Sequence, residues 1–193
     1  MVEIYRTDQQ VLSTLDDIQD GCWINMVDPT SKELEQIAER FEIEPEDIAS
    51  ALDEEESSRI SLEDGYTLIL VDIPTPEVRH EKKMYTTIPL GIILKSDAII
   101  TVCKVDTPII NYFIRNKVRE FSTKKKMRFI YQMLFRSAFV YQANLRLIDK
   151  KRIEIEERVD GDTSDTDLIE LHELESTLVY FATSLRANSI VLE

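Results

Sequence analysis

Acidic side chains are concentrated in one stretch of the chain, and they are its strongest candidates for chemistry. Eight carboxylates lie between residues 42 and 56. Carboxylate oxygens bind hard cations such as Mg²⁺, and they bind weakly when the side chains are mobile and the ion keeps its waters. We therefore expect a weak, regulatory divalent-cation site with Asp47, Asp53, Glu54 and Glu55 as candidate ligands. The alternative is a solvated acidic helix end and loop, because the sequence alone places no two of these acids in a defined cage.

Two other polar clusters fit a metal site less well. Residues 160–165 begin like a calcium-binding loop, but that motif needs Gly at its sixth position and Glu at its twelfth. Those positions hold Asp165 and Leu171, so we interpret the segment as a polar turn. His172 and Glu175 could form a ligand pair one helical turn apart, although an exposed surface pair is the simpler interpretation.

Residues typical of catalysis are scarce. Cys22 and Cys103 lie in apolar, strand-like surroundings, where a cysteine is usually a buried, reduced thiol. The chain has four glycines and contains no glycine-rich phosphate loop, nucleophile elbow or zinc-protease motif. We therefore predict neither an enzymatic activity nor an organic cofactor.

The composition is that of a folded, acidic chain. Of its 193 residues, 43% are hydrophobic, and the formal net charge is −14. Such a charge argues against nucleic-acid binding, which needs lysine and arginine for the phosphates, and it favours the attraction of cations. The longest apolar run, residues 88–94, is far shorter than the ~20 residues of a membrane-spanning helix. We therefore expect a cytoplasmic domain.

The candidate acids must be positioned by the strands and helices that alternate along the first two thirds of the chain. Patterning predicts strands at residues 2–5, 22–27, 60–62, 66–72, 87–94 and 98–104. It predicts helices at residues 11–20, after an N-cap at Thr30 or Ser31, from Pro45, and from Pro108 to Val118. Pro74 and Pro76 should end the strand 66–72, and residues 77–85 should form an exposed loop. Residues 1–126 are thus predicted to form an α/β fold, an αβα layer sandwich around a mixed β-sheet.

Residues 127–193 should form a hairpin of two long amphipathic helices, 127–159 and 166–193. In the second helix, apolar positions recur at alternating steps of three and four. We call these positions the leucine seam and expect an interface there; they are Leu171, Leu174, Leu178, Phe181, Leu185, Asn188 and Leu192. The seam could pack on the first helix, on a third helix or on another subunit, and Asn188 needs a polar partner. Because no stop signal follows Leu192, we expect the full-length chain to continue beyond Glu193.

Short sequence segments throughout the chain, here called strings, are similar to the corresponding segments of the soluble N-terminal domain of the CorA family of magnesium channels. Residues 23–25 and 28–30 resemble its early tryptophan strand and first helix start, and residues 41–45 resemble its next helix junction. Arg59 with residues 63–66 resembles its Arg-x-x-acid-x-Tyr stretch. Residues 89–94 and 99–102 resemble its paired strands, and residues 174–181 resemble its acidic helix. The order and spacing of these strings are more specific than any one of them.

The resemblance implies a domain that continues, in the family, into a stalk helix and two membrane helices with a Gly-Met-Asn pore signature. This sequence contains neither the tripeptide nor the membrane helices. The family pattern implies a homopentamer for the full-length protein and a monomer or weak oligomer for this chain alone. A regulatory cation in the family joins an acid of the α/β domain to an acid on a neighbouring stalk. The first of these acids aligns with Ser50 here, between Asp47 and Asp53.

We therefore predict the cytoplasmic, cation-sensing domain of a CorA-like divalent metal ion channel or transporter, with magnesium as the first choice of ion. Cobalt, nickel and zinc stay open as transported ions. The domain should lie at the cytoplasmic face of the cell membrane. The alternative is an acidic scaffold protein that binds a partner through its exposed helix seam and has no transport role. Two apolar runs of ~20 residues further along the full-length chain would favour the channel.

Overall fold

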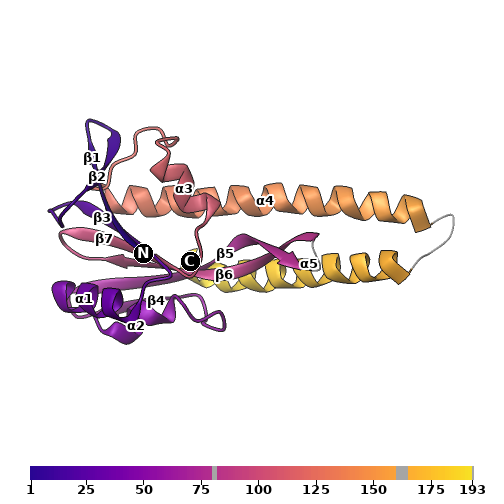
Figure 1. Cartoon of the computed structure of the whole chain (residues 1–193), viewed down its shortest axis with the longest axis horizontal. Coiled ribbons are helices and arrows are strands. Elements are labelled where there is room, and N and C mark those ends of the chain that lie inside the picture. The colour runs from indigo at the N-terminus through magenta and orange to yellow at the C-terminus, as the bar shows by residue number, and fades with distance from the viewer. Residues whose placement is uncertain (80–81, 160–164, 193) are drawn as a thin grey trace.

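The computed structural model describes residues 1–79, 82–159 and 165–192, which fold around a seven-stranded β-sheet (Figure 1). The strands stand in the order β2-β1-β3-β7-β6-β5-β4. β3 and β7 are parallel and the other neighbours are antiparallel, which confirms the predicted mixed sheet. The strands are β1 (Val2–Asp8), β2 (Val11–Leu15), β3 (Cys22–Val27), β4 (Arg59–Glu63), β5 (Tyr66–Arg79), β6 (Lys82–Leu94) and β7 (Ala98–Cys103). The helices are α1 (Ser31–Phe41), α2 (Pro45–Ser50), α3 (Pro108–Ile114), α4 (Lys126–Val159) and α5 (Asp165–Leu192).

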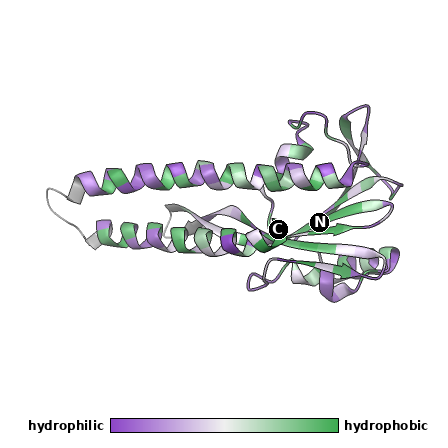
Figure 2. Cartoon of the chain, turned by 180° about the vertical axis from the view of Figure 1, so that it is seen from behind, coloured by the Kyte–Doolittle hydropathy of each residue, from purple (hydrophilic) through white to green (hydrophobic). Residues whose placement is uncertain are grey.

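Helices cover both faces of the sheet, because successive strand residues point to opposite faces and both sets are apolar. Figure 2 shows the strands as predominantly hydrophobic. Ile24 and Ile100 face α1 and α2, whereas Trp23 and Ile99 face α3 and α4. The predicted αβα layer sandwich is therefore confirmed.

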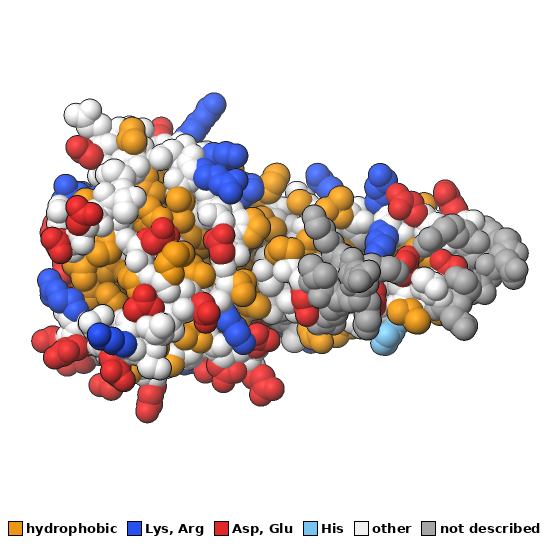
Figure 3. Space-filling model, viewed as in Figure 1, with side chains coloured by type: hydrophobic (Ala, Val, Ile, Leu, Met, Phe, Trp, Pro, Cys, Tyr) orange, Lys and Arg blue, Asp and Glu red, His pale blue; other side chains and the backbone are white. Residues whose placement is uncertain are grey.

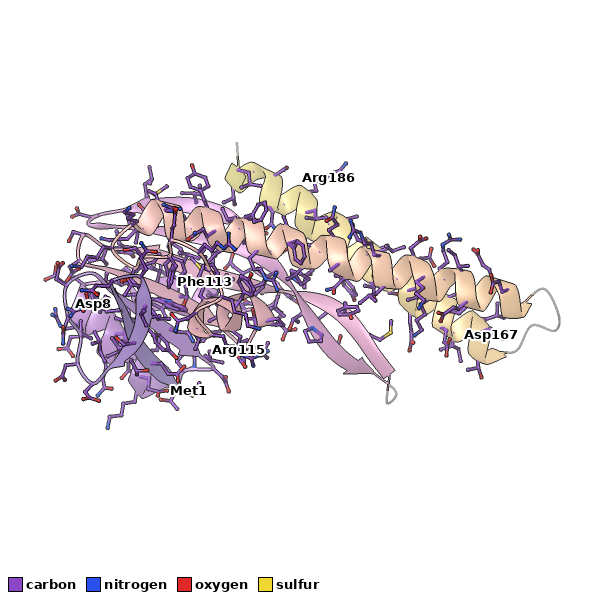
Figure 4. The ribbon with its side chains drawn as sticks, turned by 90° about the horizontal axis from the view of Figure 1, so that it is seen from above. Met1, Asp8, Phe113, Arg115, Asp167 and Arg186 are labelled. Carbon is purple, nitrogen blue, oxygen red and sulfur yellow. The ribbon has the colours of Figure 1, made fainter. Side chains whose placement is uncertain are left out.

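Four aromatic rings form the centre of the core between the sheet and α4. Trp23 from β3 contacts Phe121, from the loop after α3, and Phe129 from α4, and Phe113 from α3 contacts the same two phenyl rings. The ring centroids of Phe121 and Phe129 are 4.6 Å apart. Figure 4 shows Phe113 directed into this layer, whereas Arg115, two residues later, lies at the surface. This cluster anchors the base of α4 to the sheet.

The start of α1 follows the local rules of helix capping. The Thr30 hydroxyl accepts a hydrogen bond from the backbone N–H of Glu33, and the Glu33 carboxylate accepts one from the backbone N–H of Thr30. This reciprocal pair satisfies donors that the first turn of a helix leaves free. Of the two predicted caps, Thr30 is the correct one.

The prediction of a helix at residues 11–20 is wrong, because residues 11–15 form strand β2. β1 and β2 form a hairpin in which Asp8 pairs with Val11. Gln9 and Gln10, with φ of 45° and 70°, make the two-residue turn. A two-residue hairpin turn of this kind needs two successive residues in the left-handed conformation. The sequence Gln-Gln is not the Asn-Gly signature that usually predicts such a turn. Pairing with β1 outweighed the helical spacing of the apolar residues.

α3 ends at Ile114, one turn before the predicted end at Val118. Asn116 follows in the left-handed conformation, with φ of 53°. Its side chain accepts a hydrogen bond from the backbone N–H of Leu12 at 2.8 Å and donates to the Leu12 carbonyl at 3.4 Å. Asn116 therefore lies outside the helix, and its side chain satisfies the backbone N–H and carbonyl of Leu12 on the outer edge of strand β2.

The prediction that Pro74 and Pro76 end a strand is also wrong, as is the predicted loop at 77–85. β5 and β6 continue as a two-stranded ribbon in which Pro74 pairs with Thr87 and Pro76 with Tyr85. β4 pairs with β5 only as far as Leu70, so the outer edge of β5 is free of strands beyond this point. Prolines are tolerated on such an edge because the N–H they lack would point away from the ladder. The prediction for His80 and Glu81 lies outside the described residues.

The predicted helical hairpin is present as α4 and α5, which lie side by side and extend past the tip of the ribbon (Figures 1 and 4). With 34 and 28 residues, they measure about 50 and 40 Å. Tyr141, Ile148 and Ile155 of α4 form a separate buried cluster with Leu174 and Phe181 of α5. α4 begins where the domain boundary was predicted, yet its first turns belong to the core of the sheet. The division into 1–126 and 127–193 stays a prediction.

Within the described part of the chain, no helix combines the length and the apolarity that crossing a lipid bilayer would require.

Candidate functional site

The four predicted cation ligands are near one another in sequence, but the structure gives three of them local partners. The Asp47 carboxylate accepts a hydrogen bond from the Tyr66 hydroxyl at 2.5 Å. Glu54 forms an ion pair with Lys104 at 2.7 Å, and the Asp53 carboxylate accepts from the backbone N–H of Glu55 at 3.0 Å. Asp53, Glu54 and Glu55 are exposed, and Asp47 is partly buried.

These residues do not fit a metal cage within one copy of the chain. Among the described residues, no group of three His, Cys, Asp or Glu side chains converges as metal ligands would. A hard divalent cation takes several oxygen ligands, and within the described ranges these carboxylates do not converge to supply them at one point.

Asp47 has a structural role in this region. Tyr66 begins β5, and its hydroxyl joins the Asp47 carboxylate and the backbone N–H of Glu44 at the start of α2. Burial, followed by the hydrogen bond to Asp47, raises the pKa of Tyr66 to about 12. The phenol therefore stays protonated and fastens α2 to the β4–β5 hairpin.

The predicted leucine seam is divided between two surfaces. Leu174 and Phe181 are buried against α4, with exposed fractions of 5% and 1%. Leu178, Leu185 and Leu192 are exposed. The helix face that packs inward continues instead through smaller polar residues; these are Thr177, Ser184 and Asn188. Three of the seven seam residues are thus available to a further helix or subunit.

Asn188 has the polar partners that its position on the seam requires. They are the backbone of Asp72 on β5 and the Ser58 hydroxyl, and not a residue of another helix. Its side-chain oxygen accepts hydrogen bonds from the backbone N–H of Asp72 at 2.8 Å and from the hydroxyl of Ser58 at 2.9 Å. Its side-chain nitrogen donates to the Asp72 carbonyl at 2.8 Å. The amide thus takes the place of the strand partner that β5 loses where β4 ends, and it fixes α5 on the sheet.

An apolar groove that was not predicted from the sequence lies along α4. It encloses about 1110 Å³ between α4, the segment after α3 and the end of α5. Tyr131, Phe135 and Phe139 line it and are exposed by 64%, 76% and 50%. Their spacing of four residues could have revealed a second apolar stripe on this helix. Its rim is basic, and the cations that line it are Lys117, Arg119, Arg128 and Arg136.

Charge is distributed unevenly over the molecule. Figure 3 shows Asp and Glu gathered along the lower margin of the sheet end, where Figure 1 places α1, α2 and β4. Lys and Arg gather on the opposite margin, near α3. Because the net charge is −14, two copies repel one another at a distance, but opposite margins can attract locally.

Residues 19–193 match the family model described as CorA-like Mg2+ transporter protein. The chain belongs to the CorA family. The cobalt/magnesium transport protein CorA of Methanocaldococcus jannaschii is 26% identical over 179 residues, which cover 88% of this chain and 53% of that protein. This CorA-family chain therefore spans about half the length of the curated relative that it matches.

Solved structures show that this chain has the CorA fold. The complete structure of the CorA magnesium transporter from M. jannaschii matches 100% of this chain and 61% of its own, with a TM-score of 0.84 and 24% identity. The structure of the soluble domain of that protein matches with a TM-score of 0.83, 24% identity, 97% of this chain and 76% of its own. The predicted CorA resemblance and the predicted fold class are thus confirmed.

Proposed function

We propose that this chain is the cytoplasmic, cation-sensing part of a CorA-like divalent-cation channel, with magnesium as the transported ion. The observation that carries the proposal is the family match over residues 19–193. The acid-rich margin supports it, because exposed carboxylates attract divalent cations. The full-length protein would assemble as a homopentamer, with membrane helices outside these residues, and this part would lie at the cytoplasmic face. No covalent chemistry is assigned to it.

The regulation we propose is electrostatic. Acidic subunits repel one another, and divalent cations held weakly between them reduce this repulsion and favour the closely packed state. The exposed acids Asp53, Glu54 and Glu55 are its candidate contacts, with Asp47 restricted by its bond to Tyr66. When the internal cation concentration falls, the packing loosens.

Transport is tested with the full-length protein in vesicles that contain a magnesium-sensitive dye. An inward magnesium flux that rises as internal magnesium is removed is expected. Absence of any divalent-cation flux from correctly inserted protein would overturn the proposal. Cobalt, nickel and zinc in the same assay determine the selectivity.

Cation sensing is tested on this chain by titrating magnesium chloride and measuring the melting temperature. A ligand that prefers the folded form raises this temperature. Sodium chloride at equal ionic strength is the control, because it screens charge without specific contacts. The variant D53N/E54Q/E55Q should lose the difference between the two salts. An unchanged difference would exclude these acids.

Self-association is tested at the exposed leucines of the seam. Leu178 and Leu185 are 41% exposed, and their replacement by lysine should weaken association measured by analytical ultracentrifugation over a range of concentrations. Replacement of the exposed Thr183 by lysine is the matched control on α5. Equal association of all three proteins would place the subunit contact elsewhere.

A further inference from the structure

The two edges of the sheet differ in how their outer backbone groups are satisfied. At the β2 edge, the Asn116 side chain bonds both the N–H and the carbonyl of Leu12. At the opposite edge stands β4, which pairs with β5 on one side only (Figure 1). An exposed edge strand can pair with a further strand unless a proline, a lysine or a bulge prevents it. β4 contains neither proline nor lysine, and its register with β5 has no bulge.

The register shows which backbone groups of β4 point outwards. On β5, the N–H and carbonyl of Asp72 bond Asn188 and not β6, so the even-numbered residues of β5 direct these groups towards β4. Their partners are the three odd-numbered residues of β4. Because the direction alternates along an antiparallel strand, Ile60 and Leu62 point their N–H and carbonyl groups away from the sheet. No hydrogen bond between described residues reaches these outward groups.

The side chains of the same two residues make this edge apolar. Leu62 is 82% exposed and Ile60 is 48% exposed. Ile60 pairs with Ile69 of β5, so both side chains lie on the face of the sheet that is covered elsewhere by α3 and α4. Addition of a strand here would satisfy the free backbone groups and bury the apolar side chains together.

The sequence of β4 is self-complementary about Ser61. In an antiparallel pair of two copies centred on Ser61, the outward groups of Ile60 bond those of Leu62 of the second copy. Arg59 then lies opposite Glu63 of the second copy, and the two-fold axis repeats each contact. A shift by two residues in either direction keeps the same groups outward but places Ser61 opposite Arg59 or Glu63, so both charge pairs are lost. One register is therefore favoured.

We propose that the free edge of β4 is a pairing surface for β4 of a second copy of this chain, in the register centred on Ser61. The charge complementarity of the strand with itself supports a second copy as the partner, because pairing creates two opposite-charge and two apolar cross-strand contacts. This contact closes after two copies, so it joins two chains and builds no ring by itself. The proposal goes beyond the proposed function and depends neither on transport nor on the exposed leucines of α5.

Sedimentation equilibrium tests the pairing on the intact chain. The acidic margin near β4 opposes close approach (Figure 3), so the buffer contains about 0.15 M sodium chloride, at which the Debye length is about 8 Å. Because β4 has five residues, we expect weak association and vary the protein concentration from about 10 µM to 1 mM. The wild type should show a monomer–dimer equilibrium. A wild type that stays monomeric would overturn the proposal and favour an extended peptide of another protein as the partner.

Charge exchange tests the register. E63R creates two arginine–arginine pairs in the dimer and should weaken association by about tenfold or more. It does so although the net charge of −14 moves two units towards zero. E39R makes the same charge change at an exposed position of α1 and is the matched control, which should not weaken association. Equal association of E63R and the wild type would overturn the proposal.

A mixture of two variants tests the same register by rescue. R59E alone should associate weakly, because it creates two glutamate–glutamate pairs. An equimolar mixture of R59E and E63R should associate as the wild type does, because every cross-strand charge pair is again of opposite sign. R59E also loses the ion pair of Arg59 with Glu56, so circular dichroism first establishes that both variants are folded. Failure of the folded mixture to associate would overturn the register.

Amide exchange followed by NMR locates the contact on the wild type. The N–H groups of Ile60 and Leu62 should become more protected as the protein concentration rises. The N–H of Ser61, which faces β5 already, should change little. Association that leaves Ile60 and Leu62 unprotected would overturn pairing through β4 and place the contact on another surface.

Discussion

The replacement of Asn188 by alanine is the most informative test of how α5 is fixed to the sheet. Asn188 makes three hydrogen bonds of 2.8–2.9 Å, two with the backbone of Asp72 and one with Ser58. In the variant, the Asp72 carbonyl keeps its bond from Tyr141, but the Asp72 N–H and the buried Ser58 hydroxyl lose theirs. The change therefore removes an anchor without creating a large cavity.

The expected cost follows from the groups left without partners. A buried donor without an acceptor destabilises a protein by about 1–3 kcal/mol. Because Asp72 is only partly buried, water can reach its N–H in part, and we expect a total loss of about 2–3 kcal/mol. For a protein of this size, that loss lowers the melting temperature by about 4–12 °C.

The assay is urea and thermal unfolding followed by circular dichroism. Thr183→Ala is the matched control, because Thr183 is exposed on the same helix and also becomes alanine. Its stability should change by less than about 0.5 kcal/mol. If Asn188→Ala were no less stable than Thr183→Ala, the amide would not be the anchor that its hydrogen bonds indicate.

Three further variants test other parts of the fold by the same unfolding measurements. Phe129→Ala should cost about 3–5 kcal/mol because it opens a cavity in the aromatic core, and Phe129→Leu should cost less. Tyr66→Phe should cost about 1–2 kcal/mol at neutral pH by removing the hydrogen bond to Asp47. Because the pKa of Tyr66 is raised from 10.0 to about 12, the wild type should lose stability as the pH rises through that interval, and the variant should lose less. Gly91→Ala should cost about 1–3 kcal/mol, because its Cβ would lie 2.6 Å from the Cβ of Ala51; the second change Ala51→Gly should restore part of the loss.

Elements whose signals are local in the sequence were predicted correctly. The α1 helix has both its N-cap and its apolar face within a few residues, and strands such as β3 and β7 are apolar on both faces because both are covered. The helices of the hairpin have long periodic patterns. The residues that signal each of these elements lie within the segment itself, so the sequence alone is enough to predict them.

Errors occurred where pairing with another segment decided the outcome. Residues 11–15 have a helical spacing, but β1 offered a strand partner. Pro74 and Pro76 usually end strands, but the end of β4 left an edge on which proline is tolerated. The acids at 47–55 looked equivalent in the sequence, yet Tyr66 and Lys104, from other strands or their ends, engage two of them.

The sequence by itself determined the layered α/β class, the helical hairpin, the acidic character and the family, because each depends on composition or on local periodicity. Tertiary structure alone decided which leucines of α5 are buried and what Asn188 contacts. These depend on contacts between residues of different elements, which can be far apart in the sequence, such as Asp72 and Asn188. No local sequence pattern specifies these contacts, because they form only when the elements pack against one another.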